Sequence, residues 1–126
     1  MNRKEVERYI TEQYGAEAEY PWEQYPEYAV FRHSSNRKWF AVTMRISADK
    51  LGIPGKIMVD ILNVKCNTSV IASLLEEEPG FYPAYHMNKK NWISILLDDS
   101  VSAQKISWMV DKSYELTAIK SKKKQK

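Results

Sequence analysis

An alternating run at residues 39–46 constrains the fold of this chain more than any other part of its sequence. Apolar side chains occupy every second position, which is the period of a β-strand with one buried and one solvated face. One face would hold Phe40, Val42, Met44 and Ile46, and the other Trp39, Ala41, Thr43 and Arg45. Residues 28–33 are rich in aromatic and β-branched side chains, and segment 34–37 between the two runs has turn composition. The sequence therefore predicts an antiparallel hairpin as the start of a sheet.

The segments on either side of this hairpin predict three further strands and three helices. The strands are expected at 58–65, 82–86 and 91–97, and the helices at about 3–14, 68–78 and 102–117. Asn2 and Glu5 have the spacing of a capping box, and Gly15 ends the first helix. The order α-β-β-β-α-β-β-α contains no regular βαβ repeat. We therefore predict an α+β fold, a single antiparallel sheet of about five strands covered by helices. Residues 1–119 are expected to form one domain, followed by a flexible lysine-rich tail at 120–126.

The charge distribution excludes a uniformly basic nucleic-acid-binding chain. The formal net charge is +3, but the tail carries five lysines and no acid, so the rest of the chain sums to −2. Any basic surface must come from local clustering, as in residues 28–66, which carry seven basic and two acidic side chains. A single cysteine, Cys66, allows no internal disulfide and agrees with a reducing compartment. No run approaches the roughly 18 apolar residues of a membrane helix. We expect a cytoplasmic monomer without a membrane segment.

Few residues have the spacing that catalysis or cofactor binding would need. His33, Cys66 and His86 do not have the spacing of a zinc site, and no glycine-rich phosphate loop is present. We therefore predict no metal, no cofactor and no catalytic residue. Two alternatives stay open. Cys66 beside Lys65 could be a thiolate of depressed pKa, although a small buried residue at a strand end is the simpler interpretation. His86 could act as a general base, but no partner at a suitable spacing is evident.

Cationic residues gather at the two predicted hairpin turns. They are Arg32, Arg37 and Lys38 at the first turn and Lys89 and Lys90 at the second. Each group lies close in sequence to a tryptophan, Trp39 or Trp92, and cations beside aromatic rings are typical of surfaces that hold phosphates and stack bases. Lysine is also a common residue of exposed turns and edge strands, which is the alternative interpretation. Tyr85, Met87 and Trp92 are predicted to be mainly structural, packed between strand and helix.

Several segments together resemble the MmcQ/YjbR family. They are Asn63–Asn67 (NVKCN), Pro79–Gly80, Ala84–Trp92 (AYHMNKKNW) and Asp111–Leu116 (DKSYEL). The resemblance extends over about residues 3–118. It implies an α+β fold of the secretion-chaperone-like kind, described for one branch as a double-wing DNA-binding motif whose wings would be the two hairpins. A family function would rest on Lys65, His86, Asn88, Lys89, Lys90 and Trp92. Asn67, where the family usually has Asp, and Ala84, where Gly is common, depart from the pattern.

Three functional hypotheses follow. The first is a small non-enzymatic protein that binds nucleic acid, specifically DNA, or has a regulatory role. The cations of the hairpin turns would contact the phosphates. The second is a protein-interaction module, which a large exposed apolar patch would favour. The third is a small-ligand or enzymatic site around Lys65, Cys66 and His86, which a deep pocket holding these residues side by side would favour.

Overall fold

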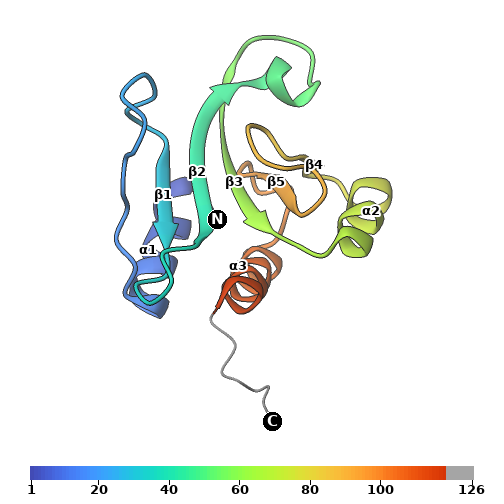
Figure 1. Ribbon diagram of the computed structural model, residues 1–126. Helices are drawn as coiled ribbons and strands as arrows, with labels where there is room; N and C mark the ends of the chain where they lie inside the picture. The colour runs from blue at the N-terminus through green and yellow to red at the C-terminus, as the bar shows by residue number, and fades with distance from the viewer. Residues whose placement is uncertain (119–126) are drawn as a thin grey trace.

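The computed structural model describes residues 1–118 and contains a five-stranded antiparallel sheet with three α-helices (Figure 1). In chain order the elements are α1 (Arg3–Tyr14), β1 (Ala29–Arg32), β2 (Trp39–Ser47), the 3₁₀ helix η1 (Ala48–Leu51), β3 (Met58–Lys65), α2 (Thr68–Glu77), β4 (Phe81–Pro83), β5 (Trp92–Leu96) and α3 (Ala103–Thr117). The strand order across the sheet is β1-β2-β3-β5-β4. The predicted α+β class and order of elements are confirmed. The predicted tail at 120–126 lies outside the described residues.

Both faces of the sheet are buried. The first, here the helix-covered face, packs against the inward residues of α1, α2 and α3, among them Val6, Ile10, Ile71, Ile106 and Met109. In Figure 1, α1 passes behind β1. The second, here the loop-covered face, packs against Trp22, Tyr28, Leu51, Ile53, Tyr85 and Met87, which belong to loops and η1. Leu62 and Val64 point to the helix-covered face, and Ile61 points to the other.

A β-bulge at Phe40 changes the predicted alternation of β2. Phe31 pairs with Ala41 and Arg32 with Trp39, so Phe40 is left without a partner on β1. A bulge places two consecutive side chains on one face. Phe40 therefore joins Ala41 on the helix-covered face, where its ring lies edge-on to Tyr14 at 5.7 Å. The prediction that Phe40 shares a face with Val42, Met44 and Ile46 is wrong, and so is the prediction that one face of β2 is solvated.

The helix ends follow the sequence signals closely. The side chain of Asn2 accepts a hydrogen bond from the Glu5 amide at 2.9 Å, and Glu5 accepts one from the Asn2 amide at 2.8 Å. Gly15 ends α1 in the left-handed conformation with φ 68°. On α2, Ile71 and Leu74 are buried, while Leu75 is 37% exposed. α2 lies beside β4, the edge strand of the sheet (Figure 1). Its buried residues form only a narrow stripe, which leaves Leu75 outside the core. Each helix within residues 1–118 is too short or too polar to cross a membrane.

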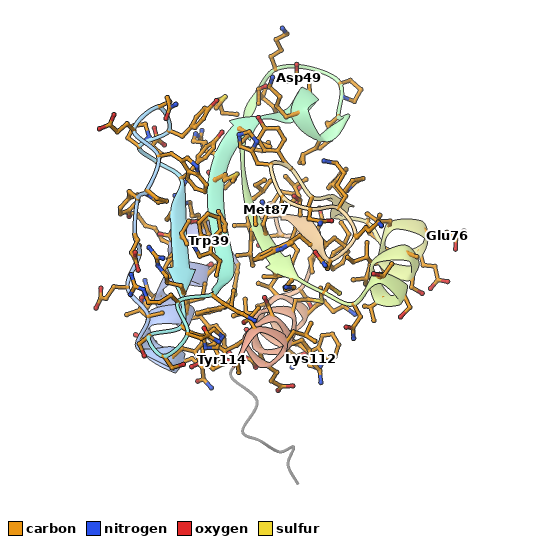
Figure 2. All side chains as sticks on the ribbon, in the orientation of Figure 1. Trp39, Asp49, Glu76, Met87, Lys112 and Tyr114 are labelled. Carbon is orange, nitrogen blue, oxygen red and sulfur yellow. The ribbon has the colours of Figure 1, made fainter. Side chains whose placement is uncertain are left out.

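The second hairpin differs most from its prediction. β4 contains only residues 81–83, and residues 84–91 form a loop instead of a strand end and a tight turn. His86 has φ 66°, a left-handed conformation that is incompatible with the extended strand predicted there. Tyr85 and Met87 then pack on the loop-covered face of the sheet, and Figure 2 shows Met87 in front of β3. The loop thus folds back over the sheet instead of projecting from it as a wing.

Candidate nucleic-acid interface

The antiparallel order brings both cationic segments to the same end of the sheet. β1 ends and β2 begins at the loop 33–38, while β3 ends at Lys65, which pairs with Trp92 at the start of β5. Ala41 near the start of β2 pairs with Val64, so the two ends adjoin through β2 and β3. We call this region the cationic end and define it by Arg37, Lys38, Lys65, Lys89 and Lys90. Figure 2 shows Lys112 of α3 near this end and Asp49 near the opposite one.

The first cationic loop is anchored to the C-terminal end of α3. The Asn36 side chain donates a hydrogen bond to the Thr117 carbonyl at 2.8 Å and accepts one from the Lys38 amide at 2.9 Å. The His33 amide also donates to the Lys38 carbonyl at 3.0 Å. Arg37 adopts a left-handed φ of 65° at the turn. These contacts fix the backbone, while the side chains of Arg37 and Lys38 remain exposed.

His33 is a structural part of this anchor. It is buried, and its Nε2 atom lies 2.8 Å from the Thr117 hydroxyl. Its ring lies 5.2 Å from Phe40 and 4.1 Å from Tyr114. Burial among these rings lowers the pKa of His33. Within residues 1–118 no three His, Cys, Asp or Glu side chains gather in a way that could hold a metal ion.

The second cationic loop is anchored to the end of β3 and the start of α2. The Asn88 side chain accepts a hydrogen bond from the Lys90 amide at 2.9 Å, and the Thr68 hydroxyl donates to the Lys90 carbonyl at 2.8 Å. The Cys66 amide donates to the Asn91 carbonyl at 2.9 Å. Lys89 and Lys90 are exposed. Asn88 therefore acts on the loop backbone and gives the two lysines a defined position.

A buried polar cluster holds the first half of the same loop on the sheet. The Asn63 side chain donates to the Tyr85 carbonyl at 2.9 Å, and the Tyr85 amide donates to the Ser94 hydroxyl at 3.0 Å. The Ser94 hydroxyl donates to the Asn63 side-chain oxygen, which closes the cluster. Asn63 and Ser94 are both fully buried, so leaving any of these groups unpaired would be costly.

Two residues predicted for the interface are engaged elsewhere. Arg32 forms an ion pair with Glu19, with its Nε 3.0 Å from Glu19 Oε1. The hydrogen bond from Arg32 lowers the pKa of Glu19, and the same contact raises the pKa of Arg32. Trp92 is only 8% exposed, which confirms its predicted structural role and leaves its ring unable to stack on a base. Tyr85 and Met87 are half-buried in the loop-covered core, also as predicted.

Of the three residues predicted for a small-ligand site, Lys65 and Cys66 lie in one cleft and His86 lies apart from them. His86 is exposed on the loop-covered side, with its ring 5.8 Å from Tyr25. Lys65 and Cys66 instead line a cleft with α2 and α3. Burial raises the pKa of the Cys66 thiol, which is the opposite of the depressed pKa that a reactive thiolate needs.

Two residues of this cleft, Trp108 and Lys112, were missed in the sequence analysis. Their spacing of four residues, on the side of α3 away from its buried stripe, is the signal that could have found them.

Several known proteins are similar to this chain in sequence and in fold. A sequence model of the family described as YjbR matches residues 11–116. Protein YyaQ of Bacillus subtilis (strain 168) is 38% identical over 117 residues, covering 93% of this chain and 98% of that protein. A crystal structure of a protein from Pseudomonas syringae is 43% identical with a TM-score of 0.90, covering 94% of this chain and 100% of that one. Protein DR2400 of Deinococcus radiodurans shares the fold at 21% identity, with a TM-score of 0.73 and coverage of 98% and 86%.

Proposed function

The chain belongs to the YjbR family, and from that premise we propose that it is a small non-enzymatic protein that binds DNA through its cationic end. The observation that carries the proposal is the meeting of two anchored cationic loops at one end of the sheet. Within residues 1–118, none of Arg37, Lys38, Lys65, Lys89 and Lys90 forms an ion pair. Cations without a protein partner are the groups that phosphates can engage most readily.

The anchoring of the two loops favours phosphate contacts. Both backbones are already fixed by hydrogen bonds to α3, β3 and α2, so binding would order only the side chains. Exposed lysine and arginine at turns contact the sugar–phosphate backbone and do not by themselves distinguish bases. The proposal is therefore for binding with little sequence preference. Arg32 has no part in it, because its charge is matched by Glu19.

The acidic run at the end of α2 lies away from the proposed contact. α2 begins beside Lys90, to whose carbonyl the Thr68 hydroxyl donates a hydrogen bond, and it ends at Glu77 after ten residues. A helix of that length spans about 15 Å. Figure 2 shows Glu76 on the outer side of α2. Glu78 is also paired with Lys105, with Oε2 3.6 Å from Nζ, so this run would oppose a bound duplex only weakly.

The test compares two variants that lose the same charge from different parts of the molecule. The loop variant replaces Arg37, Lys38, Lys89 and Lys90 with Ser. The control variant replaces Lys4, Arg8, Lys50 and Lys56 with Ser; all four are exposed, two on α1 and two in or next to η1. Binding to a short fluorescent duplex is followed by anisotropy between about 50 and 200 mM salt.

The loop variant should flatten the slope of log affinity against log salt by about 3–4, because each lost phosphate contact removes about 0.9. The control variant should keep the wild-type slope. Repeating the measurements on both variants without residues 121–126 distinguishes the contribution of the loop cations from that of the lysines in this segment. Absence of binding by the wild type at low salt, or an equal loss in both variants, would contradict the proposal.

A protein-interaction module is the second candidate, and one observation favours it. Ile57 and Met58, at the start of β3, are 72% and 48% exposed, and Tyr25 nearby is 41% exposed. This apolar patch lies at the opposite end of β3 from Lys65. Replacing Ile57 and Met58 with Ser should remove a specific co-purifying partner, identified by mass spectrometry, while the DNA salt slope stays unchanged. If the same proteins co-purify with this variant, the patch is not the docking surface.

A further inference from the structure

A cleft of about 310 Å³ opens between the end of β3, the first turn of α2 and the outer side of α3. We call it the β3–α3 cleft. Its walls include Lys65, Cys66, Val70, Trp108, Lys112 and Leu116. Small-molecule sites occupy roughly 300–1,000 Å³, so this cleft suits a molecule of one or two rings and is too small for a duplex.

The charges around the cleft favour one negative group on the ligand. Lys65 and Lys112 contribute two cations, and Glu115 contributes one carboxylate, which lies 3.5 Å from Lys112. The first turn of α2 adds partial positive charge. Asn67 at the N-cap makes no side-chain hydrogen bond to that turn, and the Thr68 hydroxyl donates to Lys90 instead. Among residues 1–118 no side chain caps the N–H groups of this turn, which carry the positive end of the helix dipole.

The remaining walls favour a flat apolar body. Trp108 is 48% exposed, and its ring centroid lies 5.5 Å from Lys112 Nζ. Val70, Leu116 and the neutral thiol of Cys66 supply apolar surface to the same cleft. A half-exposed indole beside aliphatic side chains can stack on an aromatic ring, and the cation above it can reach an acidic substituent of that ring.

We propose that the β3–α3 cleft binds a small aromatic carboxylate. The carboxylate is held by Lys65, Lys112 and the start of α2, and the ring lies against Trp108. This site does not depend on the proposed DNA binding, because the ligand fills a cleft that a duplex cannot enter, and only Lys65 is common to both.

Three probes separate the features that the proposal combines. 2-Naphthoate has both ring and charge, 2-naphthalenemethanol has the ring alone, and acetate has the charge alone. Each is titrated into the full-length ¹⁵N-labelled chain, without nucleic acid, up to about 10 mM while amide and indole signals are recorded. Naphthoate should shift the amides of residues 66–70 and the indole of Trp108 saturably, with a dissociation constant on the order of 1 mM. The alcohol should bind about tenfold more weakly, and acetate should leave these signals unchanged.

Variants at the cleft and beside it provide the second arm. Lys112→Met should weaken naphthoate binding about fivefold, because it removes a charge-assisted contact and keeps the aliphatic stem. Lys105→Met is the matched control, since Lys105 Nζ also lies 5.6 Å from the Trp108 ring but does not line the cleft. Leu116→Trp, at a residue 37% exposed, should block the cleft without unfolding the chain.

Equal binding of naphthoate and its alcohol would overturn the role of charge. Equal weakening by Lys112→Met and Lys105→Met, or shifts spread over the whole surface, would overturn the site. The naphthoate titrations are independent of DNA binding, so they test the cleft whether or not the loop variant loses affinity for DNA.

Discussion

The two faces of the sheet are equally buried but are covered in different ways. The helix-covered face packs on residues that recur with helical spacing, such as Val6 and Ile10 of α1 and Ile106 of α3. The loop-covered face packs beneath loops and η1, with no α-helix among the residues that the structure describes. Phe40 on the first face and Met44 on the second are both 0% exposed. Irregular segments can therefore bury a sheet face completely when their own contacts hold them in place.

Aromatic rings and buried hydrogen bonds provide those contacts. The ring centroid of Trp22 lies 6.0 Å from that of Tyr28 and 5.5 Å from that of Trp39. Tyr25 stacks on Tyr28 with their ring centroids 4.7 Å apart. Aromatic side chains bury a large area with few rotatable bonds, so a short segment can cover a wide part of the sheet. The hydrogen bonds of Asn63 and Ser94 to the Tyr85 backbone hold the loop 84–91, another part of this cover, on the sheet. The cover of the loop-covered face is thus held by ring contacts and side-chain hydrogen bonds in place of helical backbone structure.

The largest expected effect tests whether the two faces contribute equally to stability. Phe40→Ala should lower the free energy of unfolding by about 3–5 kcal/mol and Met44→Ala by about 2–5 kcal/mol, because each leaves a cavity in a fully buried site. Urea denaturation of both variants gives the comparison. A cost below about 1 kcal/mol for Met44→Ala would show that the loop cover yields and fills the cavity, which would break the equivalence of the faces.

The next effect concerns the polar anchor of the cover. Asn63→Ala should cost about 1–3 kcal/mol, because the Tyr85 carbonyl loses its donor in a buried site. Hydrogen exchange should accelerate first in residues 84–91 and only later in β2 and β3. Asn88→Ala is the matched control: Asn88 is exposed and bonds only within the loop, so the loss should be below about 1 kcal/mol. Uniform acceleration across the sheet in Asn63→Ala would mean that the loop does not open separately.

The smallest effect is a pH dependence on the helix-covered side. His33 has a folded pKa below its ordinary value of 6.5 because it is buried. The unfolded chain therefore takes up a proton first as pH falls, so stability is fully present above 6.5 and decreases below it. Denaturation between about pH 7.5 and pH 5 stays above the carboxylate range and isolates this contribution.

The two histidines offer an internal control. His33→Gln should be less stable than wild type but should lack this dependence on pH, while His86→Gln, at an exposed site, should retain it. If the decline persists in His33→Gln, another group is responsible for it.

Local signals in the sequence determined the elements and their order. The Asn2–Glu5 capping box, Gly15 and the alternation of residues 39–46 specify secondary structure through neighbours a few positions away. The positions of Lys89 and Lys90 in a loop could also be predicted, because polar residues there interrupt two strand segments. The family resemblance also implied the α+β fold, whose sheet and helices are present, but residues 84–91 lie over the sheet and do not form the projecting second wing.

Only the tertiary structure decided what depends on residues distant in the chain. The bulge at Phe40 arises from the register of β1 against β2, and no periodicity reports a register. Arg32 forms its ion pair with Glu19, thirteen residues away. His86 lies apart from Lys65 because the loop that contains His86 folds over the sheet. The β3–α3 cleft brings Lys65 and Val70 together with Trp108, which lies dozens of residues later in the chain. Such contacts form when faces pack together, and side-chain spacing along the chain carries too little information to select them.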